Sequence, residues 1–165
     1  MLNNLRARRD REEGFTLIEL MVVVLIIAIL IAIAIPTFLG ARERAQDRAS
    51  QSSLRNALTA AKTAYTDNSD YSKSTDADLT AIEPSLKYNP AGTASDGPNV
   101  VSVDVTNVTG TDQQSWSAAV LSKSGKCFYI RDQATGGAAG TTYGSGASTA
   151  CKGSDALAGA TGTSW

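Results

Sequence analysis

A long apolar stretch near the N-terminus constrains this chain more than any other feature. Every residue from position 20 to position 35 is apolar. The wider segment 15–39 is long enough to cross a bilayer as a helix, which needs about 20 residues. Two residues are unusual in such a segment, the acid Glu19 near one end and Pro36 near the other. Because an ionised side chain is unfavourable inside a membrane, we expect Glu19 to have a partner there.

The helical pattern continues beyond the apolar stretch, but it becomes one-sided. Apolar residues recur at helical spacing through Leu54, Leu58, Ala61 and Tyr65, with Ala57, Ala60 and Ala64 beside them. We therefore predict one helix over residues 15–66, whose second half has a single face on which a folded domain packs. Pro36 lacks a backbone N–H and Gly40 has weak helix propensity, so we expect a helix kink there.

The remainder of the chain predicts a small β-sheet. Helix-poor residues stop the helix at 67–70, and residues 71–98 indicate a connecting loop with a short helical turn near 77–82. Alternating apolar residues and a short apolar run predict strands at 99–108, 116–120 and 127–130. From Ala134 onward Gly, Ala, Ser and Thr predominate, with little to bury. The expected fold class is α+β, with a three-stranded antiparallel sheet packed on the C-terminal half of a long helix.

The segment GFTLIEL, residues 14–20, resembles the processing and assembly motif of type IV pilins and related pseudopilins. Pro36, 21 residues after Phe15, also fits that family's pattern, and the close resemblance covers about residues 13–48. It implies a pilin-like chain in four parts. These are a leader at 1–14, a transmembrane and filament-core half-helix at 15–39, an amphipathic half-helix at 40–67, and a globular head at 68–165.

The resemblance also assigns roles to three residues at the start of the helix. It implies that a prepilin peptidase, which is also the methyltransferase, cleaves between Gly14 and Phe15 and that Phe15 is then N-methylated. Glu19 would pair with the α-amino group of a neighbouring subunit during assembly. The plainer alternatives are a helix-boundary glycine at Gly14, an acid lying at the membrane surface at Glu19, and a tolerated proline rather than a hinge at Pro36.

Cys127 and Cys151 lie on the same side of the apolar stretch, 24 residues apart. That spacing is not a CxxC redox or zinc motif. If this part of the chain is exported, a disulfide that closes the C-terminal loop is the natural reading. The alternative is a pair of unrelated buried thiols. The segment Asn107-Val108-Thr109 fits a glycosylation sequon, a pattern that often occurs by chance.

Composition narrows the range of functions. The chain has no histidine, which removes Ser-His-Asp and Cys-His catalytic sets and every histidine metal site. Its 15 basic and 16 acidic residues give a net charge of −1, so electrostatics give no argument for DNA binding. We recognise no phosphate loop, no cluster of metal ligands and no activated nucleophile. We therefore expect no enzymatic activity, no cofactor and no metal.

A structural role is the expectation that follows. The resemblance implies a precursor held as a single-pass protein in the cytoplasmic membrane and then polymerised with copies of itself into an extracellular pilus. Such filaments serve adhesion, twitching motility or DNA uptake. The implied partners are the peptidase, the lipid bilayer, and a membrane assembly platform with its ATPase. The alternatives are a pseudopilin of a type II secretion system, many of which bind calcium through an acidic C-terminal region, and a membrane-tethered enzyme or receptor domain. After Asp132 this tail has only Asp155, which favours a pilin.

Overall fold

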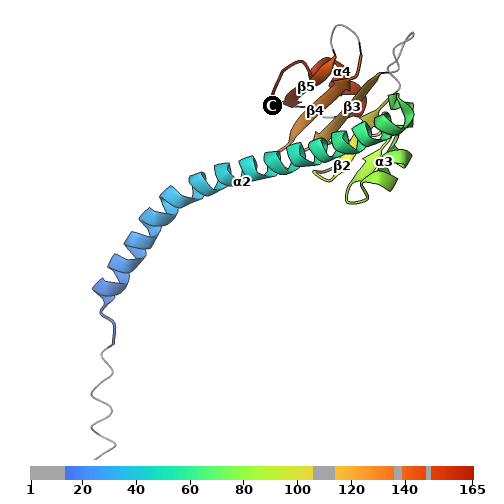
Figure 1. The fold of residues 1–165 in the computed structure, drawn as a ribbon. Helices are drawn as coiled ribbons and strands as arrows, with labels where there is room; N and C mark the ends of the chain where they lie inside the picture. The colour runs from blue at the N-terminus through green and yellow to red at the C-terminus, as the bar shows by residue number, and fades with distance from the viewer. Residues whose placement is uncertain (1–13, 106–113, 136–138, 148–149) are drawn as a thin grey trace, which may run out of the picture. The chain divides into compact units, whose positions relative to one another are not determined.

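The computed structural model describes residues 14–105, 114–135, 139–147 and 150–165. The predicted leader, except Gly14, and the sequon at Asn107 lie outside these ranges. The described chain is α+β, as predicted, with a long N-terminal helix followed by a mostly antiparallel sheet (Figure 1). It divides into two compact units, Met1–Ala41 and Arg42–Trp165, of which the second is the head.

The long helix α2 spans Leu17–Asn68. It therefore begins two residues after the predicted start and ends two residues after the predicted end, and it continues through Pro36 and Gly40. At its C-terminus Ser69 has a φ of 59°, in the left-handed region, and its N–H donates to the carbonyl of Tyr65 at 2.7 Å. A residue in that conformation ends a helix, because the chain then turns away from the helical path.

The predicted apolar face of α2 is the face that packs on the sheet. Leu54, Ala57 and Ala61 are fully buried there, and Leu58 and Tyr65 are partly buried at its margins. Most of the other buried positions on α2 are alanine or serine. The second half of α2 is thus the central element of the head.

The sheet has five strands rather than the predicted three, in the order β1-β2-β3-β4-β5. The strands are β1 Lys87–Asn89, β2 Val100–Asp104, β3 Ser115–Leu121, β4 Lys126–Gln133 and β5 Gly140–Ala147. β2, β3 and β4 correspond to the predicted strands, although residues 106–108 of the first prediction lie outside the described residues. β2 to β5 form an antiparallel meander, and β1 adds to β2 in parallel.

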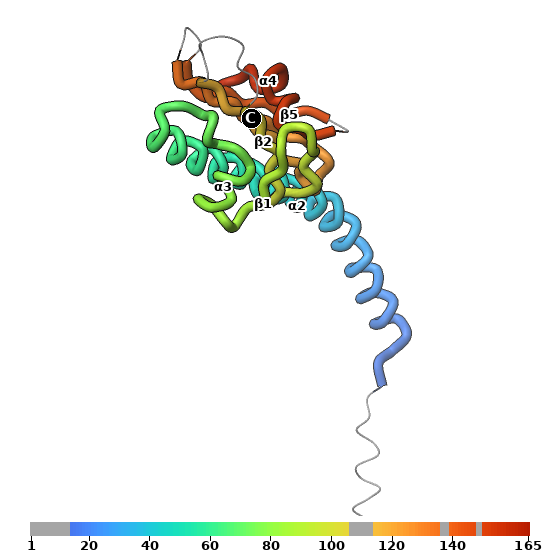
Figure 2. Tube along the Cα trace, turned by 90° about the vertical axis from the view of Figure 1, so that its right-hand side faces the viewer, coloured from blue at the N-terminus to red at the C-terminus, as the bar shows by residue number. Residues whose placement is uncertain are grey.

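Both faces of this sheet are covered. On one face Val120, Phe128 and Ile130 pack against α2. On the other face Ala119, Cys127 and Tyr129 pack against the C-terminal segment, which contains η3 (Gly153–Asp155) and α4 (Ala156–Gly159). Figure 2 shows α4 and α2 on opposite sides of the sheet. The prediction that the chain after Ala134 buries little is therefore wrong.

The predicted loop at 71–98 also contains regular structure. It forms η2 (Tyr71–Lys73), α3 (Asp76–Ile82) and β1. The position of α3 agrees with the predicted helical turn. Its start is fixed by a capping box, in which the Thr75 hydroxyl and the Asp78 carboxylate bond each other's backbone N–H. Tyr71, Leu79 and Tyr88 are buried, so this segment forms part of the core.

A buried carboxylate ties the beginning of the head helix to the turn between β3 and β4. Asp47 accepts hydrogen bonds from Ser122 Oγ at 2.8 Å, from Lys126 Nζ at 2.9 Å, and from Ser124 Oγ. Burial alone would raise the pKa of Asp47. The hydrogen bonds from Ser124, Lys126 and Ser122, together with the Lys126 charge, outweigh burial and lower that pKa below its usual 3.8.

A lowered pKa in the folded state makes the contribution of Asp47 to stability depend on pH. The contribution is complete above the carboxyl's unfolded pKa and is lost as the pH falls through the folded value. We expect Asp47→Asn to destabilise the head by about 1 kcal/mol at pH 7, because water near the surface partly screens the pair. We also expect the variant to lose less stability than the natural chain between pH 5 and pH 2. Thermal unfolding across this pH range measures both effects, and the exposed Asp96→Asn, which should leave stability unchanged, is the control. Equal stability of Asp47→Asn and the natural chain at pH 7 would contradict the first effect, and parallel pH curves would contradict the second.

A second carboxylate joins the other end of α2 to the sheet. Asp132 in β4 accepts hydrogen bonds from the Tyr71 hydroxyl and from Thr141 Oγ1, each at 2.5 Å. It also forms an ion pair with Lys62 of α2 at 3.0 Å. Burial, and then the hydrogen bond to Asp132, raise the pKa of Tyr71, so its hydroxyl remains a donor. The network links α2, η2, β4 and β5.

Cys127 and Cys151 form a disulfide, with their Cα atoms 5.6 Å apart. Both cysteines are buried, and the bond joins β4 to the segment that covers the second face of the sheet. The alternative of two unrelated thiols is not what the structure shows. The bond closes a loop of 24 residues, part of which lies outside the described residues.

Removing this disulfide should destabilise the head without changing its fold. A loop of this size restricts the unfolded chain by about 3 kcal/mol. We expect the Cys127→Ala/Cys151→Ala double variant to lose about that much in free energy of unfolding, as measured by chemical denaturation of the detergent-solubilised chain. The natural chain under reducing conditions is the matched control and should behave like the variant. An unchanged midpoint in both samples would contradict the prediction.

Candidate functional site

The junction between Gly14 and Phe15 lies outside regular structure. Gly14 is exposed, a side chain placed on it would meet no atom within 4 Å, and Phe15 is 89% exposed. Helix α2 begins only at Leu17, so both residues precede the first helical turn. These two residues therefore present an exposed backbone outside the helix, which a protease could reach.

Thr16 and Glu19 form a capping box at the start of α2. The backbone N–H and the hydroxyl of Thr16 donate to Glu19 Oε2 at 2.8 and 2.7 Å, and the Glu19 N–H donates to Thr16 Oγ1 at 3.2 Å. The pattern T-x-x-E before an apolar run is a known signal for a helix start. This role of Thr16 was not predicted, although its spacing of three residues to Glu19 follows the capping-box pattern.

This arrangement fixes the position of an acidic group beside the predicted cleavage junction. Both hydrogen bonds to the carboxylate use Oε2, so among the described residues Oε1 has no bonded donor. The helix N-terminus also favours a negative charge, because its N–H groups point toward it. Glu19 is therefore an oriented acceptor that can still bind a cation.

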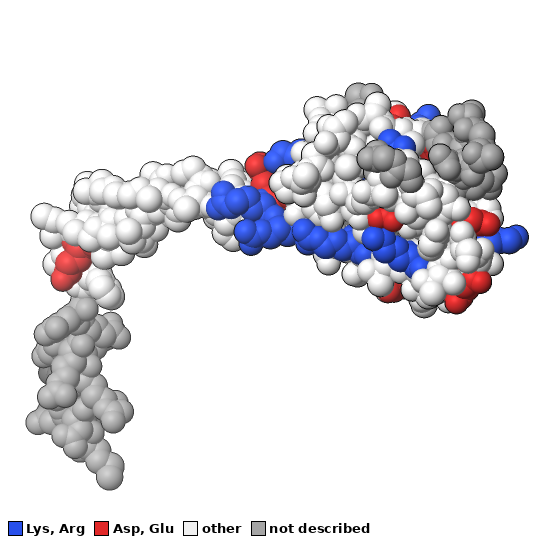
Figure 3. Space-filling model, turned by 45° about the horizontal axis from the view of Figure 1, so that its top comes forward, with Lys and Arg blue, Asp and Glu red and all other residues white. Residues whose placement is uncertain are grey.

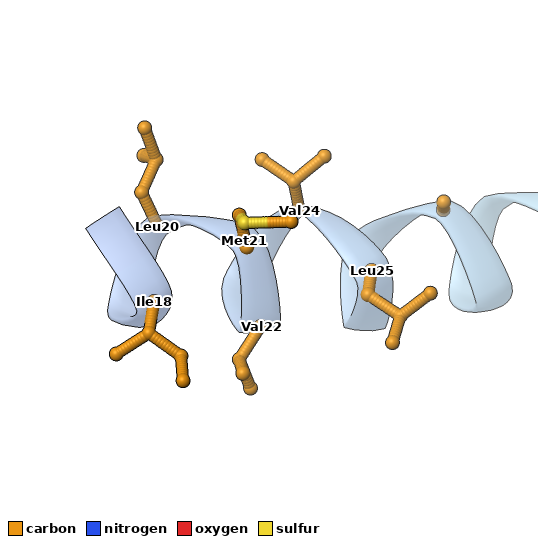
Figure 4. A pocket seen from close by; sticks show the side chains of 7 residues that line it. Ile18, Leu20, Met21, Val22, Val24 and Leu25 are labelled. Carbon is orange, nitrogen blue, oxygen red and sulfur yellow. The ribbon is translucent and has the colours of Figure 1, made fainter. Parts of the chain in front are cut away.

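The helix surface that follows is apolar on every side. The large apolar residues from Phe15 to Leu39 are exposed, with exposed fractions of 48–89%. Figure 4 shows that the side chains in the first turns of α2 point to different sides of the helix. α2 is long and apolar enough to cross a membrane, and none of its most apolar 18-residue window is buried. In water such a surface is strongly unfavourable, so it requires lipid or other helices around it.

Pro36 and Gly40 lie within α2, which is helical at both positions. Pro36 has no N–H to donate to the carbonyl one turn before it. One residue later the Thr37 hydroxyl donates to the carbonyl of Ile33 at 2.8 Å. A kink or hinge at these positions remains a prediction.

In a comparison with protein families, residues 9–35 match the prokaryotic N-terminal methylation motif. The matched segment contains the Gly14–Phe15 junction, the capping box and most of the apolar helix. The chain matches a type IV pilin-like prepilin. Comparisons with curated proteins and with solved structures gave no match.

The residues predicted for processing and assembly lie at the N-terminal end of α2. The structure places Gly14, Phe15 and Glu19 within six residues of one another and adds Thr16 to the set. The disulfide lies in the head. Both the motif and the long apolar helix fit a type IV pilin or pseudopilin precursor that is anchored in a membrane.

Proposed function

We propose that this chain is the structural subunit of a type IV pilus. It is cleaved after Gly14, methylated at Phe15, and polymerised through the apolar half of α2. The observation that carries the proposal is the exposed Gly14–Phe15 junction followed directly by an oriented carboxylate and a helix that is apolar all round. Because any helix could use this acid to cap its N-terminus, the carboxylate supports an assembly role through its combination with the methylation motif and the apolar helix.

Cleavage would change the charge beside Glu19. It would convert the Phe15 backbone nitrogen into an α-amino cation. In a bundle of such helices, where the surroundings have a low dielectric constant, a carboxylate and a cation from neighbouring copies stabilise each other, and a wrong axial register leaves both unpaired. Side-by-side packing of the apolar helices would replace the contacts with lipid. A prepilin peptidase and a membrane assembly platform with its ATPase are the partners that such a cycle needs.

The final location proposed for the filament is the cell surface. The disulfide between Cys127 and Cys151 supports exposure of the head to an oxidising compartment, because such bonds persist outside the cytoplasm. Before assembly the chain would lie in the cytoplasmic membrane, held by residues 15–39.

The direct test is intact mass and N-terminal sequencing of protein sheared from cells. We expect a chain that begins at N-methyl-Phe15 and is lighter by two hydrogens for one disulfide. A chain that still begins at Met1 and occurs only in membranes would overturn the proposal. A processed chain that forms no surface filament and needs calcium to fold would instead identify a pseudopilin.

A further inference from the structure

Four basic residues follow one another along a single exposed face of α2, within the head. They are Arg44, Arg48, Arg55 and Lys62, and we call them the basic stripe. Their spacings of four, seven and seven residues keep them on one side of a helix that turns about 100° per residue. The stripe is about 27 Å long at 1.5 Å per residue. Figure 3 shows a band of basic side chains along this part of the helix.

The head itself uses only one end of this stripe. Lys62 pairs with Asp132, and the Arg55 guanidinium lies 5.0 Å from the centre of the Trp165 ring. No hydrogen bond or ion pair joins Arg44 or Arg48 to another described residue. Like charges four residues apart weaken a helix. Arg44 and Arg48 therefore do not stabilise a single copy of the chain.

The opposite charge is concentrated elsewhere on the same head. Residues 67–83, which we call the acidic segment, contain five acids and a single base, Lys73. The acids are Asp67, Asp70, Asp76, Asp78 and Glu83. Three of them accept local hydrogen bonds, Asp70 from Ser72, Asp78 from Thr75 and Glu83 from Ser85, which fixes where their charges lie.

The stripe and the acidic segment do not neutralise each other within one copy. No ion pair joins them in the described part of the chain. Asp67 lies on α2 too, but its position 23 residues after Arg44 turns it about 140° away from the stripe. Figure 3 shows acidic side chains at the end of the head beyond the band.

We propose that the basic stripe of one copy binds the acidic segment of the next copy. The inference rests on the proposed function and names the surfaces through which the heads meet. Because the two surfaces are different, each contact leaves one stripe and one acidic segment unfilled, so the contact can repeat in one direction. It produces an open filament when the rotation between copies does not close a ring. Charge complementarity at such a contact fixes register and partner orientation.

A second copy suits these charges better than a nucleic acid does. The whole chain has a net charge of −1, and every copy carries an acidic segment that phosphates would meet as well. Repulsion from that segment would oppose a polyanion, whereas a second copy presents five acids grouped opposite four bases.

Charge reversal at both surfaces tests the proposal in cells that express the full chain. One variant is Arg44→Glu/Arg48→Glu and the other is Asp67→Lys/Asp76→Lys; none of these side chains forms a hydrogen bond or ion pair described above. We expect each to lower the amount of sheared filament by about tenfold or more. Co-expression of the two variants should restore assembly, because each acidic surface then meets a basic one. Lys87→Glu/Lys123→Glu, exposed residues outside the stripe, makes the same charge change as the first variant and should assemble normally.

The outcomes separate this inference from the proposed function. If the natural chain is never processed or never forms filaments, the proposed function fails. If natural filaments form and both reversals assemble normally, or if co-expression gives no rescue, the interface is wrong and the pilus subunit stands. If Arg44→Glu/Arg48→Glu leaves filaments intact but abolishes binding of a 30-base-pair DNA duplex, the stripe is a nucleic-acid surface and the inference is overturned.

Discussion

Glu19→Gln is expected to give a chain that is inserted and cleaved normally but yields about a hundredfold fewer filaments. Glutamine preserves the size of the side chain and can still accept from Thr16, so the helix start should survive. It removes the charge that would pair with the α-amino group of Phe15 on a neighbouring copy. Leaving one member of a buried ion pair without its partner costs about 3–5 kcal/mol, and the loss recurs at every subunit. Immunoblots of sheared and membrane fractions measure the ratio.

Two further variants make this test specific. Glu43→Gln removes an exposed acid from the same helix outside the apolar segment and should assemble normally. Thr16→Val removes the hydroxyl that holds the Glu19 carboxylate but keeps the charge. The lost capping interaction costs about 1 kcal/mol in each subunit, so the amount of filament should fall less than with Glu19→Gln. Natural amounts of filament from Glu19→Gln would contradict the assembly role of the acid.

Gly144→Ala is expected to unfold the head. A Cβ atom at this position in β5 would lie 1.8 Å from the carbonyl oxygen of Gly159, which belongs to the backbone and has no flexible side chain that could move aside. Crowding of this kind costs about 3 kcal/mol or more, a large part of the stability of a small domain. Thermal unfolding of the detergent-solubilised chain and its resistance to protease measure the loss.

The matched control is Gly92→Ala. Its added Cβ would meet no atom within 4 Å, so the change in stability should stay within about 0.5 kcal/mol. Gly153→Ala should resemble Gly144→Ala, because its Cβ would lie 2.7 Å from the backbone carbon of Val103. Equal stability of the Gly144 and Gly92 variants would show that the C-terminal segment does not pack on β5.

The elements with strong periodicity were predictable from the sequence. The buried face of α2 follows from residues such as Leu54 and Ala61 at helical spacing, and β3 follows from the alternation through Trp116 and Val120. At these positions the local pattern and the tertiary burial agree, but β3 is also buried on its other face, which the alternation does not predict. β3 is one residue longer than predicted at each end, whereas α2 begins and ends two residues later than predicted.

The missed elements are those that the rest of the fold stabilises. β5 has the sequence GTTYGSGA, whose glycines favour loops, yet it pairs with β4 along its whole length. Its small residues permit the close approach of Gly159, a contact that no local pattern reveals. Likewise Asp132 and its partner Tyr71 lie 61 residues apart, so only the folded chain brings them together.

The candidate site depends on local signals, unlike the sheet, and the roles of its residues stay predictions. Gly14, Phe15 and Glu19 lie within one short motif, and the structure places all three at the start of α2. The capping role of Thr16 was not predicted, because Glu19 was interpreted as an acid that either pairs with another copy or lies at the membrane surface.

The two carboxylate contacts have a mechanical consequence. Asp47 and Lys62 lie 15 residues apart on α2, about 22 Å along its axis, and the buried face lies between them. A pull along the helix would therefore act on both ionic contacts and on the apolar contacts at the same moment, in shear. Contacts arranged in this way must break together, whereas contacts peeled from one end break in turn. The head is thus built to resist tension along α2 more strongly than a force that lifts it away from the helix.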